Sequence, residues 1–214
     1  MEVASYLRVY FIMGSTNCEQ DPLRVLEAAL KGGITCFQFR EKGKGAKTGE
    51  EKKNLAIEMQ RLCKNYGVPF LVNDDVPLAI EVVADGIHVG QDDVPVDTIK
   101  SQCPSDFVIG VSATNHNEAI QAVKDGADYI GVGPIFATST KEDAKTPIGL
   151  NGIAKIRSHV GDLPMVAIGG IKAEDVGQIM EAGADGVSVI SAISQVESPE
   201  QAACEIKSRV DMSI

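Results

Sequence analysis

Basic side chains follow a short apolar segment near the start of the chain, in the sequence Gln38-Phe39-Arg40-Glu41-Lys42. Because side chains alternate along a strand, an extended segment would place Gln38, Arg40 and Lys42 on one face. Arginine binds phosphate oxygens through two parallel hydrogen bonds, and lysine adds a positive charge. The segment therefore predicts a cationic site for a phosphate or pyrophosphate. The alternative is that Arg40 and Lys42 are solvated loop residues paired with Glu41.

Acidic side chains follow two later apolar segments, at Asn73–Asp75 and Gln91–Asp93. Mg²⁺ prefers one or two carboxylates together with waters and phosphate oxygens. Either segment alone could equally cap a helix. Their occurrence beside a cationic segment favours a Mg²⁺ site, because the metal would offset negative charge next to a bound pyrophosphate. We expect His88 to pack behind this site, and His116 and His159 to lie on surface helices.

Two further segments are typical of phosphate binding. The stretch Gly133–Gly149 carries hydroxyls and Lys141, and such a loop could close over a phosphorylated substrate and exclude water. Its alternative is a flexible polar loop. The pair Gly169-Gly170 and the segment Gly186–Ser191 could offer backbone amides to a phosphate. Paired glycines could also form only a tight turn.

The elements that must position these residues alternate along the chain as eight apolar segments and eight segments of helical spacing. The expected strands are Arg8–Met13, Thr35–Arg40, Pro69–Asn73, Gly86–Val89, Phe107–Ser112, Tyr129–Val132, Met165–Ile168 and Gly186–Ile190. The expected helices are Asp21–Lys31, Glu50–Tyr66, Val76–Val83, Pro95–Gln102, Asn117–Asp125, Gly152–Val160, Ala173–Glu181 and Pro199–Val210.

Strands that are apolar without alternation fit a parallel sheet covered on both faces. Eight strand–helix units within 214 residues leave little room for insertions, which favours an α/β fold with a single (β/α)8 TIM barrel over an open doubly wound sheet. We expect one domain over residues 1–214. In such a barrel the carboxyl ends of the strands form the active-site face, where the segments described above would meet.

The charge balance excludes several classes of protein. Thirty acidic against 20 basic residues give a net charge of −10, which disfavours nucleic-acid binding. No apolar segment is long enough for a membrane span, and the first residues carry no basic signal-peptide region, so we expect a cytoplasmic protein. Five cysteines without a CxxC pair indicate free thiols and no zinc site.

Taken together and in order, seven segments resemble the thiamine-phosphate synthase family over nearly the whole chain. They are Gln38–Lys42, Asn73–Asp75, His88–Gln91, Gly110–Ser112, Gly133–Lys141, Ile168–Ile171 and Val187–Ser194. The resemblance implies a (β/α)8 barrel that joins 4-amino-5-hydroxymethyl-2-methylpyrimidine pyrophosphate to 4-methyl-5-(2-phosphoethyl)thiazole. The implied products are thiamine phosphate and pyrophosphate, and the implied cofactor is Mg²⁺.

The resemblance also assigns roles to individual residues. Gln38 would hydrogen-bond the aminopyrimidine. The pyrophosphate would be held by Arg40, Lys42, Asn73, Ser112 and Lys141, and of these Arg40, Lys42, Ser112 and Lys141 would be catalytic. Asp74 and Asp93 would carry Mg²⁺, with Asp93 chosen over Asp92 by its spacing from Asp74. The thiazole phosphate would be received by Thr138 and Thr140 and by backbone groups of Gly170, Ile190 and Ser191.

The chain departs from the family pattern after Ser112-Ala113, where Thr114-Asn115 replace a common His-Thr. A related thiazole tautomerase uses a histidine in this region, so the replacement argues against that activity. Two alternatives are an isomerase acting on a thiazole phosphate without metal, and a binding protein that retains the phosphate site without catalysis. Barrel helices are amphipathic whether or not they pair, so the sequence favours no oligomeric state.

Overall fold

Eight parallel strands close into a barrel, each paired with its neighbours in the chain and β8 paired with β1. The computed structural model describes residues 3–138 and 145–214. The strands are β1 Val9–Met13, β2 Cys36–Phe39, β3 Phe70–Asn73, β4 Gly86–Val89, β5 Val108–Ala113, β6 Tyr129–Val132, β7 Met165–Ile168 and β8 Gly186–Val189. The expected (β/α)8 barrel is therefore confirmed, and the open sheet is excluded.

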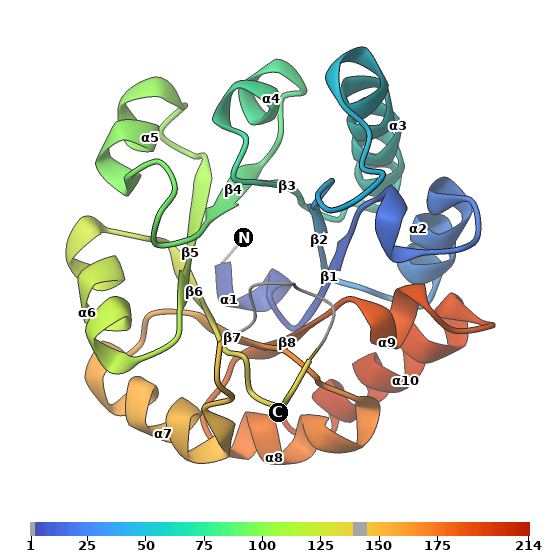
Figure 1. Ribbon diagram of the computed structural model, residues 1–214. Coiled ribbons are helices and arrows are strands. Elements are labelled where there is room, and N and C mark those ends of the chain that lie inside the picture. Colours follow the sequence, from blue (N-terminus) through green and yellow to red (C-terminus); the bar gives the residue numbers. More distant parts are fainter. Residues whose placement is uncertain (1–2, 139–144) are drawn as a thin grey trace.

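Helices surround the barrel as an outer ring (Figure 1). They are α2 Pro22–Lys31, α3 Gly49–Tyr66, α4 Val76–Glu81, α5 Val96–Gln102, α6 His116–Asp125, α7 Gly149–Val160, α8 Val176–Glu181 and α10 Pro199–Asp211. Side-chain caps start several of them: Asp21 accepts from two amides of α2, and Asn115 accepts from two amides of α6. Because these caps satisfy amides that lack helical partners, they fix where each helix begins.

Four short elements were not expected from the sequence. They are helix α1 Val3–Tyr6, the 3-10 turns η1 Ser15–Asn17 and η2 Ala173–Asp175, and helix α9 Ser191–Ser194. The expected helix Ala173–Glu181 is thus divided into η2 and α8, and α7 starts at Gly149 rather than Gly152. Elements of three or four residues are too short to show a helical period, which is why the pattern missed them.

The core has two layers. The larger one packs the outward faces of the strands against the helices. The smaller one fills the barrel interior and is formed by Tyr6, Leu7, Tyr10, Ile12, Cys36, Leu71, Tyr129, Val166 and Ile190. Tyr6 and Leu7 join this inner cluster from α1 and the residue after it, and α1 is seen through the centre of the barrel in Figure 1. The filled interior leaves one end of the barrel available for a site.

Candidate active site

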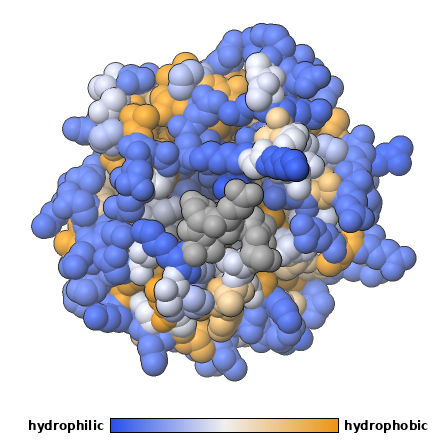
Figure 2. Space-filling view, viewed as in Figure 1, coloured by the Kyte–Doolittle hydropathy of each residue, from blue (hydrophilic) through white to orange (hydrophobic). Residues whose placement is uncertain are grey.

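A cavity of about 340 Å³ opens at the carboxyl ends of the strands. Its lining comes from residues that follow β2, β3, β4, β5, β6, β7 and β8 in the chain or lie at their ends. A much smaller cavity adjoins it deeper in the barrel, and Gln38, His88, Ser112 and Ser188 line this second space. Hydrophilic residues make up most of the surface on this face of the molecule (Figure 2).

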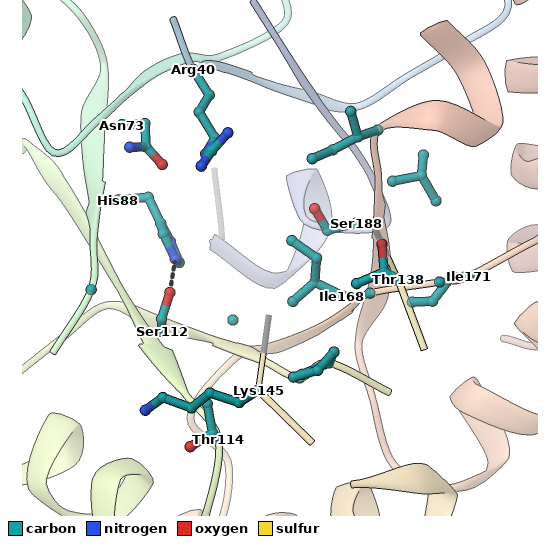
Figure 3. A pocket seen from close by; sticks show the side chains of 18 of the residues that line it. Arg40, Asn73, His88, Ser112, Thr114, Thr138, Lys145, Ile168, Ile171 and Ser188 are labelled. Atoms are coloured by element: carbon teal, nitrogen blue, oxygen red, sulfur yellow. Dashed lines mark hydrogen bonds between the residues drawn. The ribbon is translucent and has the colours of Figure 1, made fainter. Parts of the chain in front are cut away.

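Arg40 and Lys42 both line the main cavity, as predicted, although β2 ends at Phe39 and both residues lie in the loop beyond it. Arg40 points into the cavity (Figure 3) and forms no ion pair with any residue in ranges 3–138 and 145–214. Lys42 forms an ion pair with Asp74. An unpaired guanidinium in a cavity is available to bind an anion with two hydrogen bonds.

Glu41 does not pair with these cations, so the pairing that the solvated-loop alternative assumed is wrong, although Lys42 is an exposed loop residue. Its carboxylate is buried and accepts hydrogen bonds from the Ser15 amide at 2.7 Å, the Ser15 hydroxyl at 2.5 Å and the Lys47 amide at 2.8 Å. These bonds tie the loop after β1 to the loop after β2. Gly14 allows this contact, because a Cβ there would lie 2.2 Å from the Arg40 carbonyl oxygen. The hydrogen bonds of Glu41 therefore fix the backbone of the loop that carries Arg40 and Lys42.

Asp74 and Asp93 face each other across the ends of β3 and β4. Burial raises the pKa of Asp74, the Asp93 carboxylate raises it further, and the Lys42 ammonium opposes both. The Gly90 amide donates to the Asp93 carboxylate at 2.7 Å, which directs that side chain toward the cavity. Asp92 also lines the cavity, but it is Asp93 that interacts with Asp74.

Within the described part of the chain, no group of three or more His, Cys, Asp or Glu side chains could hold a metal ion. Asp74 and Asp93 are the lining carboxylates that interact with each other, so they form the pair that could hold a metal ion together with a ligand. Mg²⁺ suits such a pair, because it keeps several waters and completes its shell with substrate phosphate oxygens. A metal that needs a protein cage of three or more such ligands would not fit.

A chain of polar side chains runs from the interior of the barrel to the cavity. Gln38 donates to the Tyr10 hydroxyl at 2.7 Å, and the Tyr10 and Tyr129 hydroxyls lie 2.8 Å apart. Tyr129 lies 2.9 Å from Nδ1 of His88, whose Nε2 lies 2.9 Å from the Ser112 hydroxyl. His88 was expected to pack behind the metal site, but it lines both cavities itself and is hydrogen-bonded to Ser112 (Figure 3).

The opposite wall carries the residues expected at the thiazole phosphate. Thr138, Gly170, Ile190 and Ser191 line the cavity, and Figure 3 labels Thr138 among the lining side chains. Gly170 has a φ of +66°, and a Cβ there would lie 2.5 Å from the Ala137 carbonyl oxygen. Ser191 is the first residue of α9, whose first amides lack acceptors within the helix. Thr140 and Lys141 lie outside the described residues.

Several lining residues were not predicted as site residues. Thr114 donates its amide at 2.6 Å and its hydroxyl at 2.9 Å to Glu118, which pairs with Lys145 at 3.6 Å. All three line the cavity. A Thr-x-x-x-Glu spacing at a helix start could have indicated this contact. His116 does not replace the missing family histidine in the cavity, because its ring packs against His159 with centroids 5.0 Å apart.

Ser188 was predicted only as part of β8. Its hydroxyl is buried, has no hydrogen-bond partner in the described residues, and lines both cavities. An unpaired buried hydroxyl costs free energy unless a ligand or water bonds it. It therefore offers a hydrogen bond at the floor of the cavity.

The described site residues thus come together. Arg40, Lys42, Asn73, Asp74, Asp93, Ser112, Thr138, Gly170, Ile190 and Ser191 all line the main cavity, and Gln38 lines the smaller one. The five cysteines are free thiols. Among the helices described, none has the length and apolarity needed to cross a bilayer.

Comparisons with known proteins agree with this geometry. A family profile for thiamine monophosphate synthase matches residues 9–193. A thiamine-phosphate synthase of Bacillus thuringiensis strain Al Hakam is 54% identical over 213 residues, covering 100% of this chain and 97% of the relative. One from Bacillus cereus strain ATCC 10987 is 56% identical over 197 residues, covering 92% and 88%. The structure of a thiamine phosphate pyrophosphorylase from Pyrococcus furiosus superposes with a TM-score of 0.88 at 33% identity, covering 99% of each chain.

Proposed function

Because the chain belongs to the thiamine monophosphate synthase family, we propose that it transfers a pyrimidinylmethyl group from 4-amino-5-hydroxymethyl-2-methylpyrimidine pyrophosphate to 4-methyl-5-(2-phosphoethyl)thiazole. The products are thiamine phosphate and pyrophosphate, and the reaction belongs to thiamine biosynthesis. The observation that carries the proposal is that one cavity brings together the Lys42–Asp74 pair, the Asp74–Asp93 pair and Arg40, which forms no ion pair within the described residues. That arrangement suits a departing pyrophosphate.

The chemistry requires charge stabilisation rather than a base. The bond from the pyrimidine methylene to the pyrophosphate oxygen breaks, and its electron pair leaves with the pyrophosphate. The electron-rich aminopyrimidine ring delocalises the resulting cation, and the thiazole nitrogen supplies the electron pair of the new carbon–nitrogen bond. Arg40, Lys42, Asn73 and Ser112 would hold the leaving group, with Lys141 completing the set, because positioned cations and donors stabilise developing negative charge.

The substrates would occupy opposite walls of the cavity. The Gln38 carbonyl oxygen would accept a hydrogen bond from the pyrimidine amine at the floor of the cavity. The thiazole phosphate would be held by Thr138 and Thr140 and by the amides of Gly170, Ile190 and Ser191. Asp74 and Asp93 would hold Mg²⁺, which supplies a counter-charge for the pyrophosphate oxygens when bound. Cytoplasmic location and the absence of nucleic-acid partners stay predictions from the sequence.

The proposal is tested by incubating the protein with both substrates and Mg²⁺ while measuring thiamine phosphate and pyrophosphate. We expect equal amounts of the two products. Arg40→Ala should lower kcat/KM by about 100-fold, because it removes a preorganised partner of the leaving group. Arg61→Ala, a change of the same type on an exposed part of α3, should leave kcat/KM unaltered.

Two outcomes would contradict the proposal. Conversion of the thiazole phosphate without release of pyrophosphate, surviving EDTA, would identify an isomerase. Binding of both ligands with neither consumed would identify a binding protein.

A further inference from the structure

The polar chain through the barrel joins two groups that face the site. One end is Gln38, which lines the smaller cavity, and the other is Ser112, which lines both cavities. Four hydrogen bonds link them through Tyr10, Tyr129 and His88, with heavy-atom separations of 2.7, 2.8, 2.9 and 2.9 Å. Tyr10 and Tyr129 come from β1 and β6, which lie on different sides of the barrel (Figure 1).

The Gln38 amide, as the donor at one end, sets the direction of each hydrogen bond in this row of polar side chains. The Gln38 amide nitrogen donates to Tyr10, so the Tyr10 hydroxyl proton is directed to Tyr129. Tyr129 then donates to Nδ1 of His88, which leaves the imidazole proton on Nε2 for Ser112. Burial and the Cys36 thiol raise the pKa of Tyr10, and burial and the Tyr10 hydroxyl raise that of Tyr129. Both hydroxyls therefore keep the protons that the chain requires.

This direction determines what the two ends present to a ligand. The Gln38 carbonyl oxygen accepts no hydrogen bond from the described residues, so it remains as an acceptor. Ser112 accepts from His88, so its own proton remains as a donor. If every hydrogen bond in this row ran in the opposite direction, Gln38 would present a donor and Ser112 an acceptor. Both ends would change together, because each tyrosine has one proton to donate.

We propose that Tyr10, Tyr129 and His88 are positioning residues that hold Gln38 as an acceptor for the substrate amine and Ser112 as a donor to the pyrophosphate. The proposal rests on the function proposed above, whose pyrimidine substrate presents an amine donor and an anionic acceptor. The forward direction of the chain complements both groups, whereas the reverse direction opposes both. Specificity for an amino-substituted ring next to a pyrophosphate is thereby built into the barrel core.

The first test is the protonation of His88 in the free protein, which does not depend on any activity. Nitrogen-15 NMR of histidine-labelled protein, in a background of His116→Gln and His159→Gln, reports His88 alone. We expect the proton on Nε2 and an Nδ1 resonance shifted by an accepted hydrogen bond. Tyr129→Phe should remove that shift. A proton on Nδ1 in the unsubstituted network would overturn the proposal.

The second test compares three tyrosine variants that each lose one hydroxyl. Tyr10→Phe and Tyr129→Phe should raise KM for the pyrimidine pyrophosphate or lower kcat by about tenfold, since each leaves Gln38 or His88 without its partner. Tyr6→Phe is the matched control, because Tyr6 belongs to the same inner cluster but its buried hydroxyl has no partner in the described residues. It should retain the original kinetic constants.

A double-mutant comparison distinguishes a positioning role of Tyr129 from a general loss of packing in the barrel core. Because Tyr129 acts through Ser112, Tyr129→Phe combined with Ser112→Ala should cost less than the product of the two separate fold-losses. Multiplicative losses, or equal losses in Tyr6→Phe and Tyr129→Phe, would overturn the proposal. A protein that shows the expected His88 resonances but never forms thiamine phosphate would instead contradict the proposed function alone.

Discussion

At the scale of single residues, the buried carboxylate of Glu41 has a consequence for its two cationic neighbours. Its three donors come from Ser15, which follows β1, and from Lys47, which lies further along the loop that carries Arg40 and Lys42. A buried carboxylate is stable only when its oxygens are hydrogen-bonded in this way. The acidic residue between two cations thus anchors the backbone and leaves the Arg40 guanidinium available for a ligand.

We predict that Glu41→Gln destabilises the fold by about 2 kcal/mol, because the new amide group would place N–H groups against N–H and O–H donors. Denaturant unfolding measures this change. The same variant should raise KM for the pyrimidine pyrophosphate, since the loop that positions Arg40 and Lys42 would no longer be fixed by the Glu41 hydrogen bonds. Glu19→Gln, on an exposed residue of the neighbouring loop, is the control and should leave both quantities unchanged. Equal stability in the two variants would show that Glu41 is not an anchor.

At the scale of elements, Glu118 links the end of β5 to the first turn of α6 and to Lys145. Partial burial acts to raise the pKa of Glu118, but the Thr114 amide and hydroxyl and the Lys145 ammonium lower it overall. A carboxylate with a depressed folded pKa stabilises the fold above its unfolded pKa, and this stabilisation is lost as the pH falls through the folded pKa.

We therefore predict that Glu118→Gln costs about 1 kcal/mol of unfolding free energy at neutral pH. The difference from the unsubstituted protein should shrink as the pH falls from about 5 to about 3, where the carboxylate becomes protonated. Urea unfolding across this range, with the exposed Glu58→Gln as the comparison, checks the sign. A difference that grows on acidification would refute this account of Glu118.

The sequence predicted the eight strand–helix units because apolar strands and helical spacing are local patterns. It also predicted that Arg40 and Lys42 would reach one site, and both line the cavity although they lie just beyond the end of β2. It did not predict the contact between Tyr10 and Tyr129, which are 119 residues apart and meet only after the barrel closes. Nor did it predict the φ of +60° at Asp74, an uncommon conformation for a residue other than glycine.

At the scale of the whole molecule, closure of the barrel places basic groups where an acidic protein can bind an anion. The chain carries a net charge of −10, yet Arg40, Lys42 and Lys145 line one cavity at the strand ends. Two of the carboxylates there, Asp74 and Asp93, face each other, and the pKa of Asp74 is raised mainly by its burial and further by the Asp93 carboxylate. A divalent cation would relieve the repulsion between these carboxylates and attract a pyrophosphate to the same place.

Calorimetric titration with inorganic pyrophosphate tests this pairing of metal and anion most directly. We expect pyrophosphate to bind in the presence of Mg²⁺, and its affinity to fall by at least about tenfold when EDTA removes the metal, when Asp74 is changed to Asn, or when Arg40 is changed to Ala. Arg61→Ala should bind as the unsubstituted protein does. Equal affinity with and without Mg²⁺, retained in Arg40→Ala, would contradict the assignment of this cavity as the pyrophosphate site.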